Sequence, residues 1–178
     1  MAWFGKPSQS KSVDGLFKVL WNLFEKTSEG KIPNLPTPGF QLPDSQFRYL
    51  MFSFITAYVA CAPKFRNPDA VLNELMYRLV TAAIQLDSHR FFGGPVEGQD
   101  AANRAGKYVQ DYMDQWSAQI DIRKAGNEPA AIGIVAGMIH HTESELPFTK
   151  EDGERLFKLA RWIVGSMTAM AGAFSDLT

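Results

Sequence analysis

One stretch of the chain, residues 47–62 (FRYLMFSFITAYVACA), constrains the fold more than any other. Its last 14 residues or so, Tyr49 to Ala62, carry no charged side chain. Strands usually run 4–8 residues, so this length favours a helix, about 20 Å long at roughly 1.5 Å per residue. A bilayer span needs about 20 residues, and shorter apolar runs are more often core helices. We therefore predict a buried central helix, capped by Asp44, on which the other helices pack.

Apolar residues recur at helical spacing in several further segments, which we predict to be helices: 12–28, 67–89, 97–124, 127–141 and 149–173. No segment reads convincingly as a strand. The sequence therefore predicts an all-α, single-domain bundle of about six helices spanning residues 12–178. Residues 1–11 are predicted to form a flexible N-terminal arm. Its Trp3 and Phe4 either cover a groove of the same chain or contact a partner.

Composition and charge exclude several classes of protein. The chain has 178 residues, 46% of them hydrophobic and 21% charged, which is ordinary for one globular domain. The net charge of −1 comes without a basic patch, so we expect no nucleic-acid partner. The single cysteine, Cys61, cannot form a disulfide within the chain, which suits a reducing compartment. The first residues also lack the apolar core of a secretory signal, so we predict a cytoplasmic protein.

The segment between the first two predicted helices, residues 31–43 (KIPNLPTPGFQLP), holds four prolines and a glycine. It cannot be helical, because proline lacks the backbone N–H and clashes with the preceding turn. Its apolar residues, which include Ile32, Leu35 and Phe40, argue against a free linker. We call this segment the strap and predict that it lies extended over the bundle. It could gate a groove, dock onto a second subunit, or hold an apolar ligand against the central helix.

Two patterns in the last two predicted helices favour particular packing. Gly133 and Gly137 form a G-x-x-x-G in a helix rich in small residues, which predicts close packing on a neighbouring helix. In the last helix, Thr149 and Asp152 resemble a capping box. The same helix offers two pairs at i, i+4 spacing, Glu151 with Arg155 and Glu154 with Lys158, which we expect to be weak surface ion pairs.

The strongest candidate for chemistry is the end of the fifth predicted helix, where His140, His141 and Glu143 occur together. His140 and Glu143 are three residues apart and share a helix face, so they could bind a divalent metal ion or act as a base and its orienting group. A third metal ligand would have to come from elsewhere, and His89 is the only other histidine. The alternative is a polar helix end, where a histidine near the negative end of the dipole has no chemical role.

Other candidates for catalysis are weaker. Cys61 lies within the apolar stretch, and buried thiols are usually inert. The chain has no H-E-x-x-H motif, no nucleophile elbow, no Walker loop and no G-x-G-x-x-G. We therefore expect no bound cofactor and favour a protein that is not an enzyme.

The sequence leaves two functions open. The first is a non-enzymatic helical binding or interaction protein that self-associates, as a homodimer, or binds a protein partner. It rests on the missing catalytic motifs, the apolar strap and the small-residue helix. The alternative is a helical bundle with a metal or small-molecule site near His140, His141 and Glu143, which His89 would complete and which could be enzymatic.

Overall fold

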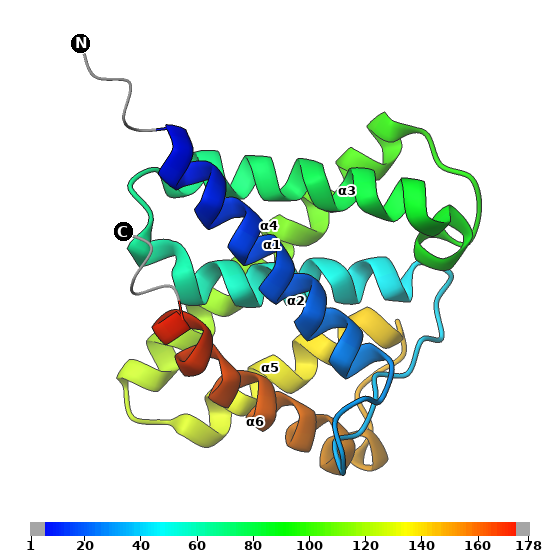
Figure 1. Cartoon of the computed structure of the whole chain (residues 1–178). Coiled ribbons are helices and arrows are strands. Elements are labelled where there is room, and N and C mark those ends of the chain that lie inside the picture. The colour runs from blue at the N-terminus through cyan, green and yellow to red at the C-terminus, as the bar shows by residue number, and fades with distance from the viewer. Residues whose placement is uncertain (1–5, 174–178) are drawn as a thin grey trace.

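The computed structural model describes residues 6–173 and contains only helices and connections over that range (Figure 1). The elements in chain order are α1 (Lys6–Ser28), α2 (Ser45–Cys61), the 3-10 turn η1 (Ala62–Lys64), α3 (Pro68–Phe92), α4 (Gly98–Lys124), α5 (Glu128–Glu143) and α6 (Lys150–Ala173). The predicted all-α, single-domain bundle is confirmed. Helix α1 starts at Lys6, within the segment predicted as an arm, while Trp3 and Phe4 lie outside the described residues.

Helix α2 is the centre of the bundle, as the apolar stretch predicts. It packs against each of the other five α-helices, and Figure 1 shows it running through the middle of the molecule. Burial extends around its circumference, and Phe52, Phe54 and Ile55 are all inaccessible to solvent. The polar Thr56 is also buried, and its hydroxyl donates to the carbonyl of Phe52. No helix of the described chain is long and apolar enough to cross a bilayer.

The other helices form an open ring around α2. In order around the ring, α1 packs on α3, α3 on α4, α4 on α5 and α5 on α6. Among the described residues, no comparable contact joins α6 back to α1. The strap leaves the end of α1 and runs beside α6 (Figure 1). The opening of the ring is therefore where the strap meets the bundle.

Several helix boundaries follow the capping signals in the sequence. Asn67 and Asn127 accept hydrogen bonds from the backbone N–H groups of Ala70 and Ala130, and so cap α3 and α5. Thr149 and Asp152 form the predicted capping box. Asp44 precedes α2 but makes no side-chain cap. Helix α3 runs past the predicted end at residue 89 because it kinks at Asp87 and then adds a final turn.

The prediction of close packing at Gly133 and Gly137 is wrong. Both glycines are half-buried, on a face of α5 that is turned partly toward solvent. A Cβ atom added at Gly137 would meet no described atom within 4 Å. One added at Gly133 would meet the ring of Phe157 at 3.7 Å, an ordinary van der Waals distance. Helix α5 instead packs through other residues, among them Val135 and Ala136, which are fully buried.

Candidate functional site

A buried carboxylate, that of Glu143, fixes the strap to the bundle. Glu143 is the last residue of α5, and its side chain is only 2% exposed. Arg155 of α6 donates to both carboxylate oxygens, from Nη1 to Oε1 at 2.8 Å and from Nη2 to Oε2 at 2.5 Å. The backbone N–H of Gly39 in the strap also donates to Oε1, at 2.8 Å. A buried charge is tolerated when it is paired and hydrogen-bonded, and Glu143 meets both conditions.

Further hydrogen bonds join the strap to the same two helix ends. The backbone N–H of Gln41 donates to the backbone carbonyl of Glu143 at 3.2 Å. Arg155 Nη1 also donates to the carbonyl of Thr37 at 3.2 Å. The hydrogen bonds to Glu143 raise the pKa of Arg155 above its usual value, so the guanidinium stays charged. The last residue of α5, the strap and the second turn of α6 are therefore tied together by one charged pair.

The strap is also held by packing. Leu35 and Phe40 lie against the hydrophobic core, and the ring of Phe40 meets that of Tyr49 edge-on, with centroids 6.0 Å apart. Asn34 has a φ of 62°, the one left-handed non-glycine residue in the described chain. Asparagine tolerates this conformation better than most residues. The strap therefore lies over the bundle, as predicted, with a tight bend at Asn34.

A groove runs between the strap and α6. It has a volume of about 850 Å³ and is open to solvent along one side. On the strap side it is lined by Ile32, Pro33, Asn34 and Leu35. A second hollow of about 500 Å³ shares Asn34, Leu35, Glu154 and Lys158 with the first, and extends it toward Glu151 at the start of α6. The groove between the strap and the bundle thus lies against α6, whereas the sequence suggested a ligand held between the strap and the central helix.

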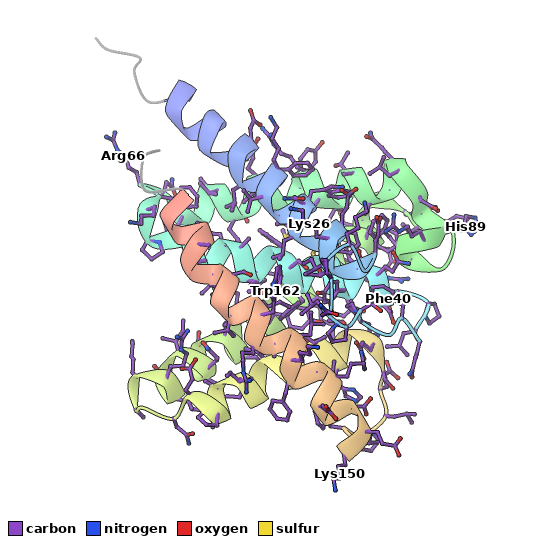
Figure 2. The ribbon with its side chains drawn as sticks, turned by 60° about the horizontal axis from the view of Figure 1, so that its bottom comes forward. Lys26, Phe40, Arg66, His89, Lys150 and Trp162 are labelled. Carbon is purple, nitrogen blue, oxygen red and sulfur yellow. The ribbon has the colours of Figure 1, made fainter. Side chains whose placement is uncertain are left out.

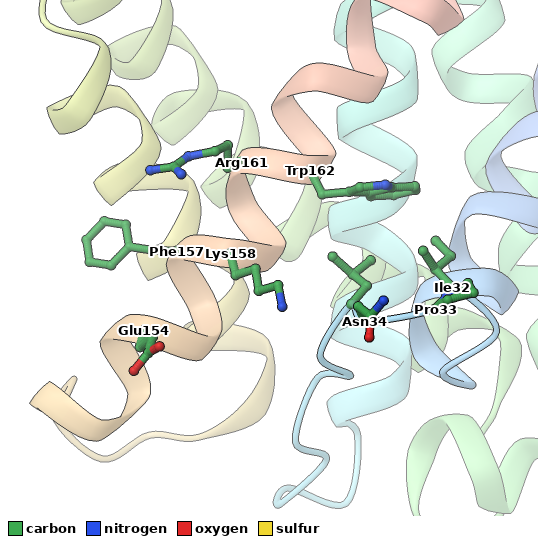
Figure 3. Close-up of a pocket in the computed structure, with 9 residues that line it drawn as sticks. Ile32, Pro33, Asn34, Glu154, Phe157, Lys158, Arg161 and Trp162 are labelled. Atoms are coloured by element: carbon green, nitrogen blue, oxygen red, sulfur yellow. The ribbon is translucent and has the colours of Figure 1, made fainter.

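The α6 side chains that line the groove extend from two sides of that helix. Figure 3 shows Trp162 extending toward Ile32 and Pro33, and Lys158 extending toward Asn34. Phe157 and Arg161, which also line the groove, extend from the other side of α6. The ring of Phe157 lies near Gly133 and Gly153. The groove therefore has an apolar end at Trp162 and a polar middle at Lys158 and Asn34.

A second buried polar cluster lies at the start of α2. The carboxylate of Asp44 accepts hydrogen bonds from Arg48 Nε at 2.9 Å and from the Tyr108 hydroxyl at 2.5 Å. The guanidinium of Arg48 also lies 5.1 Å from the centre of the Tyr108 ring. Burial and the neighbouring Asp44 raise the pKa of Tyr108 to about 12. These contacts explain why Asp44 does not cap α2, and they join the start of α2 to α4.

The structure does not bring the three predicted metal ligands together. His140 Nε2 lies 2.9 Å from the backbone carbonyl of Leu146, and Glu143 is paired with Arg155. His89 is exposed, and Figure 2 shows it extending away from the bundle at the far end of α3. Across residues 6–173, no group of three or more histidine, cysteine, aspartate or glutamate side chains is placed to hold a metal ion. The geometry gives the metal-binding alternative no support.

The remaining candidates for chemistry are a half-buried histidine, His141, and a buried thiol, that of Cys61. Burial lowers the pKa of His141, with a further contribution from Arg48, so the imidazole is neutral near pH 7. Its ring meets that of Tyr112 edge-on at 6.2 Å. Burial raises the pKa of the Cys61 thiol to about 11, which leaves little thiolate at neutral pH.

Sequence reasoning missed Arg155 and therefore the anchor of the strap. The i, i+4 spacing suggested a surface pair with Glu151, but Arg155 pairs with Glu143 and with Asp152, at 3.6 Å. The one signal in the sequence is Glu143 itself. It is an acidic residue at the end of an apolar helix, and its carboxylate needs a cation as a partner if it is buried.

Comparison of the chain with models of protein families, with curated proteins and with solved structures gives no match.

Proposed function

We propose that the protein is a non-enzymatic binding protein that holds an apolar small molecule in the groove between the strap and α6. One observation carries the proposal: an open, largely apolar groove of about 850 Å³ whose strap wall is fixed by a buried ion pair. Ligand sites are usually concave, mostly apolar and preformed, with volumes of about 300–1,000 Å³. The strap supplies such a wall because Glu143 and Arg155 fix its middle to the bundle.

The residues that line the groove favour binding over catalysis. They include no serine, threonine, cysteine or histidine, so the lining holds no hydroxyl or thiol nucleophile with a histidine base beside it. The apolar contacts come from Trp162, Ile32 and Leu35, all of them half-buried. We keep the cytoplasm as the predicted compartment, because the single Cys61 suits a reducing environment.

Protein-detected NMR with a neutral aromatic alcohol, 2-naphthylethanol, tests the groove. We expect the alcohol to shift the indole N–H signal of Trp162, identified by its loss in the Trp162→Phe variant. The Trp162→Ala variant should bind at least tenfold more weakly, because it removes most of the apolar wall. Trp21→Phe is the matched control, since Trp21 is a half-buried tryptophan of α1 outside the groove. Shifts confined to other parts of the bundle would contradict the proposal.

A second candidate, self-association as a homodimer, is favoured by an exposed apolar corner. Leu146, Phe148 and Phe157 are 70%, 42% and 39% exposed, three of the five large exposed hydrophobic residues in the described chain. They lie at one corner of the bundle, because the rings of Phe148 and Phe157 meet edge-on, and the His140 ring lies against Phe148 and near the backbone carbonyl of Leu146. Contiguous exposed apolar residues mark interaction sites in many soluble proteins.

Sedimentation velocity tests the homodimer. A two-fold interface would bury Leu146 twice, so the Leu146→Ser variant should weaken the dimer at least tenfold. Leu86→Ser is the matched control, because Leu86 is 66% exposed on α3 and lies outside the corner. A monomer at all concentrations, or equal effects of the two variants, would count against self-association through this corner.

A further inference from the structure

The groove carries a cation at the edge of its apolar end. Lys158 lies one helical turn before Trp162, on the same face of α6, and Figure 3 shows it extending toward the strap beside Asn34. Within the described chain, Lys158 makes no ion pair and the side chain of Asn34 makes no hydrogen bond. The expected pair between Glu154 and Lys158 is not formed. An ammonium group and an amide, both exposed to solvent, thus border the apolar wall without a partner among the described residues.

We infer that the ligand of this groove is a compact apolar molecule with one carboxylate. This inference rests on the proposed binding function and adds the chemical class of the ligand. The apolar body would lie against Trp162, Ile32 and Leu35, and the carboxylate would accept hydrogen bonds from Lys158 and Asn34. Lysine is a point charge with three donors, and the amide of asparagine adds two more.

The charges at the other end of the groove limit the size of the ligand. Toward the start of α6 the hollow is lined by Glu151, Glu154 and Arg155. Arg155 is already paired with Glu143, so the two glutamates leave this end with an excess of negative charge. An anionic ligand is therefore kept to the Trp162 end. The turn from Lys158 to Trp162 covers about 6 Å of helix, so a ligand with its carboxylate at Lys158 and its body on Trp162 is expected to be an aryl or short acyl carboxylate.

The main alternative to a carboxylate ligand is an amine, because the carboxylate of Glu154 could attract an ammonium group. Lys158 lies between Glu154 and the apolar wall along the helix, so an amine whose body packs on Trp162 would meet the ammonium first. A neutral ligand would use the apolar wall alone. The three kinds of ligand therefore rank differently under the inference, with the carboxylate first and the amine last.

Matched naphthyl ligands test the ranking: 2-naphthylacetate, 2-naphthylethanol and 2-naphthylethylamine, titrated while the Trp162 indole signal is followed. We expect the acetate to bind about fivefold more tightly than the alcohol, the effect of one partly exposed ion pair. The Lys158→Gln variant should lose that preference while binding the alcohol unchanged. Lys150→Gln removes the same charge from the same helix, and Lys150 does not line the groove, so this variant should keep the preference.

Each result has a distinct meaning. Equal binding of acetate and alcohol, tighter binding of the amine, or equal effects of Lys158→Gln and Lys150→Gln would overturn the carboxylate class and leave the groove standing as a binding site. If none of the three ligands moves the Trp162 signal, the groove itself fails as a site, and the inference fails with it. A carboxylate preference that depends on Lys158 alone would support both.

Discussion

At the scale of single residues, Glu143 is the most informative side chain of the molecule. Its carboxylate is almost fully buried, and a carboxylate without a partner in such a place would cost several kcal/mol. Arg155 and Gly39 satisfy it from two different segments. The ion pair therefore positions the strap as well as stabilising the fold, because its hydrogen bonds form only when the strap lies against α6.

Removing Arg155 should destabilise the fold more than neutralising Glu143. The Arg155→Met variant leaves the carboxylate buried without its cation, so we expect it to lose about 2–4 kcal/mol of the free energy of unfolding, less than for a fully buried pair because Arg155 is partly exposed. The Glu143→Gln variant keeps an acceptor for Gly39 and should lose about 1–2 kcal/mol. Urea denaturation measures both values.

The exposed Glu151, which spacing alone would pair with Arg155, provides the control. Glu151→Gln should change the free energy of unfolding by no more than about 0.5 kcal/mol. If its effect equalled that of Arg155→Met, the partner assignment of Arg155 would be wrong.

At the scale of elements, the strap is held at its far end by the end of α3. Gly93 follows the last turn of α3 with a φ of 75°, a left-handed conformation that glycine adopts without cost. A Cβ atom at Gly93 would lie 2.7 Å from the Cβ of Pro43, the last residue of the strap. Gly93 therefore serves two purposes, since it ends the helix and lets the strap approach.

The two roles of Gly93 can be separated by comparison with Gly126. Gly126 follows α4 with a φ of 79°, but a Cβ there would meet nothing within 4 Å among the described residues. Gly126→Ala should therefore cost only the backbone strain, about 1 kcal/mol. Gly93→Ala should cost at least about 1 kcal/mol more, because it adds a steric clash with Pro43. Thermal or urea unfolding measures the difference in the free energy of unfolding between the two variants. Equal losses would show that the strap moves away from residue 93 without a cost in stability.

The elements that could be predicted are those whose signal is local. Helical periodicity and the caps at Asn67 and Asn127 predicted where α3 and α5 begin. The start of α1 was missed because residues 6–11 are mostly polar and carry no apolar periodicity. The kink at Asp87 was missed because its carboxylate caps the new turn through the N–H of Arg90, a contact no periodicity reports.

At the scale of the whole molecule, the fold was predictable and the site largely was not. A single charge-free stretch fixed the centre of the bundle, since no other helix could be buried on all sides. The groove instead joins the strap to a helix more than a hundred residues away, where Arg155 donates to the carbonyl of Thr37. Sequence spacing shows which residues share a helix face, but it does not show which face a distant segment covers. The opening of the helix ring between α1 and α6 could therefore not be predicted from the sequence.

The anchor of the strap also sets an order of events during synthesis. Gly39 and Glu143 are 104 positions apart. At about 5–20 residues per second, a ribosome adds the second residue roughly 5–20 s after the first. During that interval the strap has neither its carboxylate nor α6 to lie against, and its apolar side chains are open to other partners. The groove is thus among the last features to assemble, and the nascent chain should be most vulnerable to aggregation just before α6 is complete.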